Sequence, residues 1–363
     1  MKEEAKARLR DGGRKRLDVS LAGKSSGAGM SELGLLDEIR GRIAKSPSRG
    51  VALGIGDDCA LLSVRSGEEL AVTTDLSIAG RHFRLDWHPA ESIGHRALAR
   101  GLSDLAAMGA RPVAAFLSLG LPRTLTRGRG RGPSWISRFY EGLLALADAH
   151  GVPLAGGDLA ESPVALADIV LVGAVPRGKA LLRSGALPGD LLYVTGSLGG
   201  AAAGLARLAG LAATSGLRGR TGALRVPKGL EGLLAAHLYP QPRIAQGLWL
   251  RRRGLASAAI DLSDGLSTDL AHLCAESDVA AEVEAALLPI GAGANLEQAL
   301  HGGEDYELLF TAAAAAQLPK SIGGVAVRRI GKIVRSGKGR PPVTLVTAQG
   351  KRALEPSGWE HFS

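Results

Sequence analysis

The segment AIDLSDGLSTDL, residues 259–270, places three aspartates between an apolar run and a helical pattern. The run that ends at Asp261 is typical of a short buried strand, and the glycine and hydroxyl residues after it are typical of a turn into a helix. A strand that passes directly into a helix is a repeating unit of α/β folds. The segment therefore predicts an α/β fold, and the negative charge at the joint needs an explanation.

Aspartate recurs in apolar, glycine-rich surroundings along the rest of the chain. The other segments are GIGDDCALL (54–62), VTTDL (72–76), LSDLAAMGA (102–110) and LAGGDLAES (154–162). Predicted strands alternate with predicted helices throughout, and 363 residues exceed what one core usually holds. We expect two domains of α/β (α+β) class with mixed sheets and flanking helices, over residues 30–176 and 177–363.

The composition is typical of a folded globular protein, with 45% hydrophobic and 22% charged residues. Aromatic residues make up only 4% of the chain. Single-stranded nucleic acids are usually bound by stacking bases on aromatic side chains. The composition therefore argues against that class of binding protein.

The net charge of +9 is concentrated in two segments. Residues 1–30 carry eight Lys and Arg against four Asp and Glu, and RTLTRGRGR (123–131) adds four arginines without an acidic residue. Blocks of like charge are usually solvated. We interpret residues 1–29 as a disordered basic tail and the second segment as an exposed loop, and we expect no nucleic-acid partner.

Cys59 and Cys274 form neither a disulfide framework nor a metal-binding spacing. No run of about 18 apolar residues occurs, and the basic N-terminus lacks the apolar stretch of a signal peptide. We therefore expect a cytoplasmic protein with no membrane partner.

Asp104 lies on a helical stripe of small residues, with Ala97, Gly101 and Met108, and should point inward. Burying an unpaired carboxylate is costly. The five acidic segments contain no lysine or arginine, so we expect the compensating positive charge to come from outside the chain. Oxygen ligands without histidine or cysteine favour Mg²⁺, which proteins often hold together with substrate phosphates. Several carboxylates predict a polyphosphate bound through more than one Mg²⁺.

Glycines in GIG, AGGD and HGGED would let the backbone approach phosphate oxygens closely. The chain contains neither a P-loop motif nor G-x-G-x-x-G between a strand and a helix. We interpret GSLGGAAAG (196–204) as a closely packed helix start. No nucleophile or general base stands out, but phosphoryl transfer depends mainly on positioning and charge neutralisation.

The chain resembles the thiamine-monophosphate kinase family, which belongs to the superfamily of aminoimidazole ribonucleotide synthetase and selenophosphate synthetase. The resemblance extends from about residue 30 to the C-terminus and rests on eight motifs in family order: GIGDDCALL, TTDLSIAGRHF, LSDLAAMGARP, AGGDLAES, LLYVTGSLGG, AIDLSDGLSTDL, HGGEDYELLF and GWEHF.

The resemblance implies in-line transfer of the γ-phosphoryl group of ATP to thiamine monophosphate with several Mg²⁺ ions. It also implies a homodimer whose N-terminal domains, which bind ATP and Mg²⁺, form a barrel together. It implies metal ligands at Asp58, Thr73, Thr74, Asp75, Asp104, Asp158, Asp261 and Asp264, ATP contacts at Gly157, Asp158, Arg183 and Ser263, and thiamine monophosphate contacts at His82, Glu304 and Trp359. The C-terminal domain completes the substrate site.

Two alternatives remain open. A non-catalytic nucleotide-binding or nucleic-acid-binding protein would keep the fold and use the basic segments, with salt-sensitive binding that depends on the tail. Another enzyme of the same superfamily would hydrolyse ATP without forming thiamine diphosphate. The chain has no cysteine before residue 50, where selenophosphate synthetase would have one in a glycine-rich segment. It ends in WEHFS, whereas the hydrogenase-maturation member of the superfamily would end in a reactive cysteine.

Overall fold

The structure, a computed structural model, describes residues 50–55, 59–127, 133–214 and 226–358, and five isolated positions: Gly34, Ile39, Gly41, Arg42 and Thr221. The predicted tail 1–29, the metal-ligand candidate Asp58 and the substrate candidate Trp359 lie outside the described residues, as do residues 128–132 of the basic loop.

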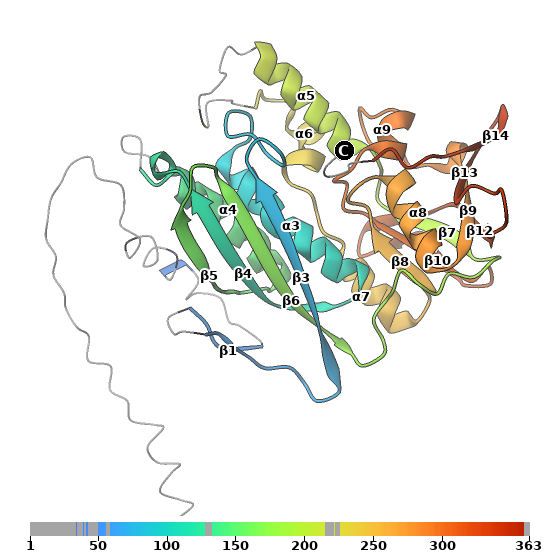
Figure 1. The fold of residues 1–363 in the computed structure, drawn as a ribbon, viewed down its shortest axis with the longest axis horizontal. Helices are drawn as coiled ribbons and strands as arrows, with labels where there is room; N and C mark the ends of the chain where they lie inside the picture. Colours follow the sequence, from blue (N-terminus) through green and yellow to red (C-terminus); the bar gives the residue numbers. More distant parts are fainter. Residues whose placement is uncertain are drawn as a thin grey trace, which may run out of the picture.

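A four-stranded sheet forms the N-terminal domain, in the spatial order β3-β6-β4-β5 (Figure 1). Its strands are β3 (Glu68–Ile78), β4 (Arg111–Leu121), β5 (Leu154–Glu161) and β6 (Leu166–Pro176). β6 is antiparallel to β3 and β4, whereas β4 and β5 are parallel, so the sheet is mixed. A two-stranded pair, β1 (Val51–Leu53) and β2 (Leu61–Leu62), packs on this sheet.

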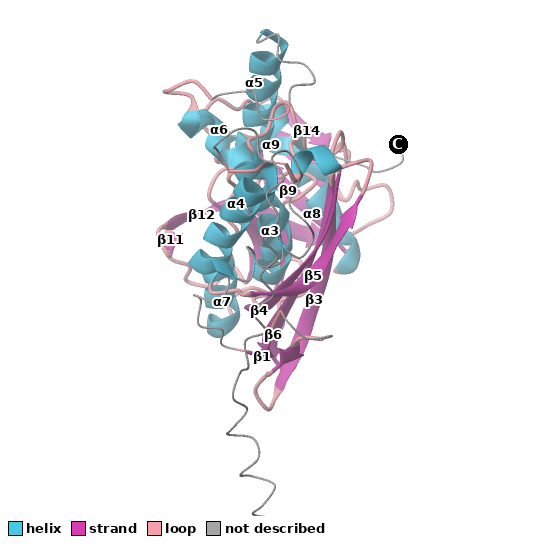
Figure 2. Ribbon diagram, turned by 90° about the vertical axis from the view of Figure 1, so that its left-hand side faces the viewer, coloured by secondary structure: helices cyan, strands magenta, loops and turns pink. Residues whose placement is uncertain are grey.

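Two long helices, α3 (Ala90–Ala107) and α4 (Trp135–His150), cover one face of this sheet (Figure 2). They touch at two glycines. A Cβ at Gly94 would lie 1.9 Å from the carbonyl oxygen of Phe139, and one at Gly142 would lie 1.9 Å from that of Glu91. Because the backbones meet directly, the position of α3 is tightly constrained.

The opposite face of the sheet, which we call the open face, is covered only in part. Side chains alternate along a strand, so Leu70, Val72 and Leu76 of β3 point away from α3. They are 51%, 61% and 44% exposed, respectively. β3 is an edge strand, and an exposed apolar row on an edge strand is typical of a contact with another protein chain.

An eight-stranded mixed sheet forms the C-terminal domain, in the order β14-β13-β9-β12-β7-β10-β8, with β11 paired to β12. β13 and β9 are parallel and the other pairs are antiparallel. The strands are β7 (Leu191–Thr195), β8 (Ala258–Asp261), β9 (Val279–Glu284), β10 (Leu308–Ala312), β11 (Ser321–Ile322), β12 (Val325–Arg335), β13 (Val343–Thr347) and β14 (Gly350–Ala353).

Helices pack on both faces of this second sheet. α7 (Ile244–Arg253) packs on the face toward α3, and α8 (Leu266–Glu276) packs on the other face. α5 (Gly200–Thr214) and α6 (Glu231–Leu238) pack against each other, and α9 (Leu296–His301) contacts α5 and α8. The short 3₁₀ helices are η1 (Arg123–Leu125), in the N-terminal domain, and η2 (Ala285–Leu287). Side chains along β10 point alternately to the two faces of the sheet. Leu308 and Phe310 belong to the core shared with α3, whereas Leu309 belongs to the core beneath α8.

Helix α3 lies between the two sheets. It contacts β3 and β6 on the N-terminal side, and β8 and α7 on the C-terminal side. The approach to α7 is again a backbone contact, since a Cβ at Gly247 would lie 1.9 Å from the carbonyl oxygen of Ala106. Side chains of α3 can therefore reach residues of both domains.

Within the described part of the chain, no helix has the length and apolar character needed to cross a membrane. Both cysteines are unpaired; Cys59 is exposed and Cys274 is buried. Neither lines the cavity described below.

Candidate active site

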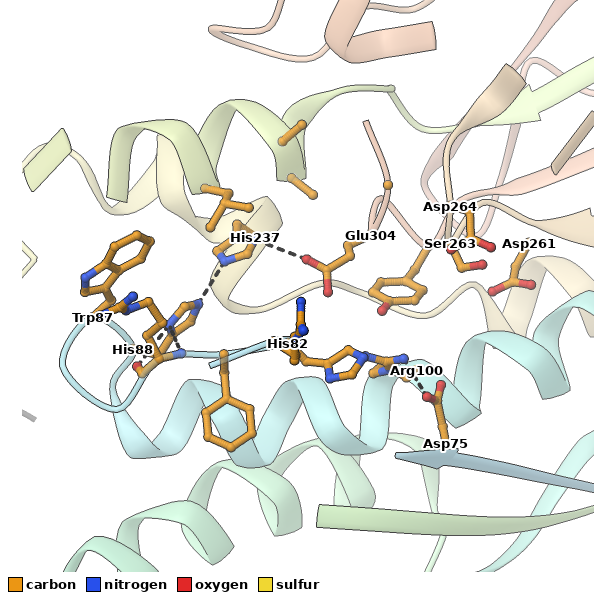
Figure 3. A pocket seen from close by; sticks show the side chains of 18 of the residues that line it. Asp75, His82, Trp87, His88, Arg100, His237, Asp261, Ser263, Asp264 and Glu304 are labelled. Carbon is orange, nitrogen blue, oxygen red and sulfur yellow. Dashed lines mark hydrogen bonds and ion pairs between the residues drawn. The ribbon is translucent and has the colours of Figure 1, made fainter. Parts of the chain in front are cut away.

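A cavity of about 500 Å³ lies where the two domains meet. The N-terminal domain contributes the end of β3, the loop 80–88 and α3. The C-terminal domain contributes the start of α5, His237 of α6, the β8–α8 turn and the loop 303–306. In Figure 3 the aspartates lie at one end of the cavity, and Trp87 and His88 lie at the other.

Four aspartates line the acidic end: Asp75, Asp104, Asp261 and Asp264. Asp75 lies here because alternation along β3 turns it toward α3, which carries Asp104. Asp261 is the last residue of β8, and Asp264 lies in the turn before α8. The fold thus brings together carboxylates from three distant parts of the sequence.

Asp104 and Asp261 have hydroxyl groups as hydrogen-bond donors. Thr73 Oγ1 donates to Asp104 Oδ2 at 2.5 Å, and Ser103 Oγ donates to Asp261 Oδ2 at 2.6 Å. Burial raises the pKa of both carboxyls, and the charge of Asp261 raises that of Asp104 further. Such buried anions favour a nearby cation, and oxygen ligands suit Mg²⁺. Among the described residues, no three His, Cys, Asp or Glu side chains are already placed to hold a metal ion.

Asp75 differs because its partner is an arginine of the chain itself. Arg100 Nη2 lies 2.6 Å from Asp75 Oδ1 (Figure 3). The prediction that the compensating positive charge comes only from outside the chain was therefore wrong for Asp75. The acidic segments contain no arginine, but Arg100 lies four residues before Asp104 on α3, so helix spacing brings it to the same place.

Asp269, the third aspartate of the segment 259–270, braces the turn before α8. Its Oδ2 accepts hydrogen bonds from the backbone N–H groups of Asp264 and Gly265, both at 3.0 Å. Burial raises the pKa of this carboxyl to about 8. Asp269 therefore holds the backbone that presents Ser263 and Asp264 to the cavity.

Glu304 lines the part of the cavity away from the aspartates, and its carboxylate has two partners. Arg96 Nη2 lies 2.6 Å from Glu304 Oε1, and His237 Nδ1 lies 3.7 Å from Oε2. His88 and His237 contact each other through their Nε2 atoms at 3.0 Å. Burial alone would raise the pKa of Glu304, but Arg96 brings it below its usual value. Burial, followed by the charge of Arg96, lowers the pKa of His88 to about 3 and that of His237 well below its usual value.

The loop between β3 and α3 supplies aromatic groups to the wall of the cavity, among them His82 and Trp87. His82 Nδ1 accepts a hydrogen bond from the N–H of Ile78 at 3.1 Å, which orients the ring. The guanidinium of Arg84 lies 4.7 Å from the centroid of the Trp87 ring, a distance typical of a cation–π contact. The cavity therefore combines acidic oxygens with flat rings.

Five of the described residues predicted to bind metal or ATP do not line this cavity: Thr73, Thr74, Gly157, Asp158 and Arg183. Thr74 is on the open face, because Thr73 points toward α3. Asp158 also points to the open face, since its neighbour Leu159 packs in the helix-side core. Gly157 has φ 148°, and a Cβ there would lie 1.9 Å from the carbonyl oxygen of Leu117, so this position requires glycine.

Two other ATP-contact candidates lie at the acidic end. Ser263 lines the cavity. Arg183 is exposed and does not line it, but its charge opposes the rise in the pKa of Asp104 and Asp261, so it lies within electrostatic reach of both.

The glycine-rich start of α5 is occupied by a carboxylate of the chain. Asp305 accepts hydrogen bonds from the N–H of Gly199 at 2.5 Å and from that of Ala201 at 2.9 Å. Burial raises the pKa of Asp305 to about 7. A Cβ at Gly199 would lie 2.7 Å from the backbone nitrogen of Ala299. The glycines therefore serve close packing, in agreement with the interpretation of GSLGGAAAG.

Sequence reasoning did not identify Arg96, Arg100, Trp87 or His237 at this site. α3 carried a usable signal, because Arg96, Arg100 and Asp104 recur every four residues and therefore share one helix face. Trp87 and His237 had no local signal, because their place at the cavity depends on how distant elements pack.

Two family models match the chain: AIR synthase related protein, N-terminal domain, over residues 56–180, and AIR synthase related protein, C-terminal domain, over residues 188–343. The thiamine-monophosphate kinase of Escherichia coli (strain K12) is 42% identical over 275 residues, which cover 74% of this chain and 78% of the relative. That of Bacillus subtilis (strain 168) is 32% identical over 351 residues, with 92% and 100% covered.

Solved structures agree with these matches. The crystal structure of thiamine-monophosphate kinase from Stenotrophomonas maltophilia K279a is 39% identical with a TM-score of 0.73, covering 87% of this chain and 97% of that one. AaThiL complexed with AMPPCP and TMP is 28% identical with a TM-score of 0.68, covering 94% and 100%. The hydrogenase maturation protein HypE in complex with ATP has a TM-score of 0.68 at 19% identity, covering 93% and 97%, and shares the fold.

Proposed function

Because this chain belongs to the AIR synthase related proteins, and within them to the thiamine-monophosphate kinases, we propose that it transfers the γ-phosphoryl group of ATP to thiamine monophosphate by Mg²⁺-dependent in-line displacement. The observation that carries the proposal is the cavity between the domains, with carboxylates at one end and His82 and Glu304 farther along it. AaThiL, whose structure contains AMPPCP and TMP, has the same fold over the whole of its chain.

The acidic end is proposed to hold Mg²⁺. The raised pKa of Asp104 and Asp261 supports this, because both are buried acids with only hydroxyl groups as side-chain donors. Bound Mg²⁺ would neutralise charge on the transferring phosphoryl group. The proposed ligands are the four aspartates that line the cavity, Asp75, Asp104, Asp261 and Asp264, and Thr73, which lies beside Asp104. Asp58, Thr74 and Asp158 are proposed as further ligands.

Thiamine monophosphate is proposed to contact His82 and Glu304, with Trp359 as a third contact. Glu304 is held as a carboxylate by Arg96, so it suits a cationic or hydrogen-bond-donating part of the acceptor. No general base is assigned. A phosphate ester has a second pKa of about 6, so the acceptor is already mostly ionised at neutral pH.

ATP is proposed to contact Gly157, Asp158, Arg183 and Ser263. Two of these, Gly157 and Asp158, belong to β5 rather than to the cavity, which supports ATP binding near a second copy of the chain. We propose a cytoplasmic homodimer whose open faces combine into a barrel. Residues 30–176 would then form the ATP/Mg²⁺-binding and dimerisation domain, and residues 177–363 would complete the substrate site.

The direct test incubates the purified protein with ATP, Mg²⁺ and thiamine monophosphate and measures thiamine diphosphate. Formation of the diphosphate that stops on addition of EDTA and resumes with excess Mg²⁺ is the expected result. Hydrolysis of ATP without thiamine diphosphate would instead indicate another reaction of the superfamily.

A variant that lacks residues 1–29 separates the kinase from the nucleic-acid-binding alternative. We expect its thiamine diphosphate formation to match that of the full chain. A full chain without kinase activity, which forms a salt-sensitive RNA or DNA complex that this deletion abolishes, would favour the alternative.

A further inference from the structure

Arg96 of α3 contacts two of the three residues that are proposed to bind thiamine monophosphate, His82 and Glu304. Its side chain is only 6% exposed. Nη2 donates to Glu304 Oε1 at 2.6 Å and to the carbonyl oxygen of His82 at 3.2 Å. Nη1 donates to the carbonyl oxygen of His237 at 2.6 Å. One guanidinium therefore holds three separate segments.

These three segments come from both domains. His82 lies in the loop after β3, whereas Glu304 and His237 belong to the C-terminal domain. Arg96 itself lies on the helix that is held by backbone contacts with α4 and α7. Its planar fork of donors has little freedom once the helix is placed. The distance between His82 and Glu304 is thus set by an arginine on a rigid element.

Glu304 needs such a partner. It is one of three non-glycine residues with positive φ, at 67°, in the described part of the chain, a conformation that surrounding contacts must maintain. An unpaired carboxylate at this depth would tend to take up a proton. The adjacent His88 and His237 do not supply positive charge, because burial keeps their imidazoles neutral. Arg100, the next arginine on α3, is paired with Asp75.

We propose that Arg96 is the positioning residue of the acceptor site, which sets His82 and Glu304 at the separation that thiamine monophosphate requires. The inference rests on the proposed function. Arg96 does not line the cavity, so it acts through these two residues rather than directly on ATP or the reacting phosphates. Its loss should weaken acceptor binding selectively, because the ATP contacts lie on other segments.

The test compares Arg96→Met and Arg96→Lys with the wild-type enzyme at saturating Mg²⁺. We expect Arg96→Met to raise the KM for thiamine monophosphate by roughly tenfold or more, since a small displacement of positioning groups weakens productive binding strongly. The KM for ATP should stay within about twofold. Arg96→Lys keeps one charge near Glu304 but not the fork that also reaches His82 and His237, so it should recover only part of the loss; it tests the role of the fork if the methionine variant folds poorly.

The matched control is Arg111→Met. Arg111 Nη2 forms an ion pair with Glu68 Oε2 at 3.1 Å, at the start of β4 and outside the cavity. This variant should leave the KM for thiamine monophosphate unchanged. A second arm combines Arg96→Met with Glu304→Gln. In this background Arg96→Met should raise the KM for thiamine monophosphate by a much smaller factor than it does alone, because the carboxylate that Arg96 holds is already removed.

The outcomes distinguish the positioning role of Arg96 from the proposed kinase function. Equal rises in both KM values, no rise in either, or full additivity with Glu304→Gln would overturn the positioning role while thiamine diphosphate formation by the wild-type enzyme stands. A wild-type enzyme that makes no thiamine diphosphate overturns the proposed function, and with it the assignment of an acceptor site that Arg96 could position.

Discussion

Asp261 is a buried carboxylate and Asp104 is a half-buried one, and their side-chain donors, Ser103 and Thr73, carry no charge. The helical stripe in the sequence predicted that Asp104 points inward. Its partners could not be predicted, because Thr73 and Asp261 reach it from other elements. The same holds for Arg100, which neutralises Asp75 although neither the spacing nor the motifs pair the two.

Asp104→Asn should lower the activity and raise the thermal stability. Thiamine diphosphate formation should fall by about 100-fold or more, because the change removes a proposed Mg²⁺ ligand. Without Mg²⁺ at pH 8 the melting temperature should rise by about 2–4 °C, because a buried charge is removed. The pKa of Asp104 in the folded protein is raised above its value of about 3.9 in the unfolded chain. The ionised side chain therefore destabilises the fold only when the pH is above about 3.9. The gain should therefore shrink as the pH falls toward 4.

Thermal unfolding followed by circular dichroism at pH 8 and at pH 4 measures this effect, and Glu141→Gln, at an exposed position of α4, is the control. The control should change neither activity nor melting temperature. A variant with near-wild-type turnover at saturating Mg²⁺ would show that Asp104 is not a metal ligand.

Helix α3 is the element on which the site depends. Its apolar and small residues predicted a helix, and the structure has one at Ala90–Ala107. The sequence did not reveal that Gly94 lies on the backbone of α4, because a glycine inside a helix is equally compatible with open space. Which case applies depends on the neighbouring helix, and that is a matter of tertiary packing.

Gly94→Ala should therefore destabilise the protein by about 1–3 kcal/mol despite the better helix propensity of alanine, since the added Cβ overlaps the carbonyl oxygen of Phe139. Gly210→Ala is the matched control, because Gly210 lies in α5 with nothing within 4 Å of a Cβ. It should stabilise the protein by up to about 1 kcal/mol. Urea unfolding of both variants gives the comparison, and equal effects would argue against a backbone contact between α3 and α4.

The two sheets of the protein have unequal surroundings. The C-terminal sheet has core on both faces, whereas the N-terminal sheet leaves Leu70, Val72 and Leu76 of β3 exposed on its open face. An apolar row of this kind is stable in water when a second chain covers it. This is the physical support for the proposed homodimer.

Val72→Lys should shift the protein from dimer to monomer at micromolar concentration while the fold persists, because a charge would be buried at the interface. Light scattering after size-exclusion chromatography measures the mass, and circular dichroism checks the fold. Leu187→Lys changes another exposed leucine, in the segment between β6 and β7, and should leave the mass unchanged. A wild-type chain that is monomeric at this concentration would contradict the dimer.

The α/β class, the mixed sheets and the family could be predicted from the sequence alone, because hydrophobic periodicity, turn residues and ordered motifs are local properties of the chain. The folded structure was needed to show which aspartates share a cavity, that Thr74 and Asp158 point to the open face, and that Arg96 and Arg100 pair with Glu304 and Asp75. The reason is physical: these pairings depend on how two sheets pack against one helix, and a contact across that helix leaves no pattern in either segment alone.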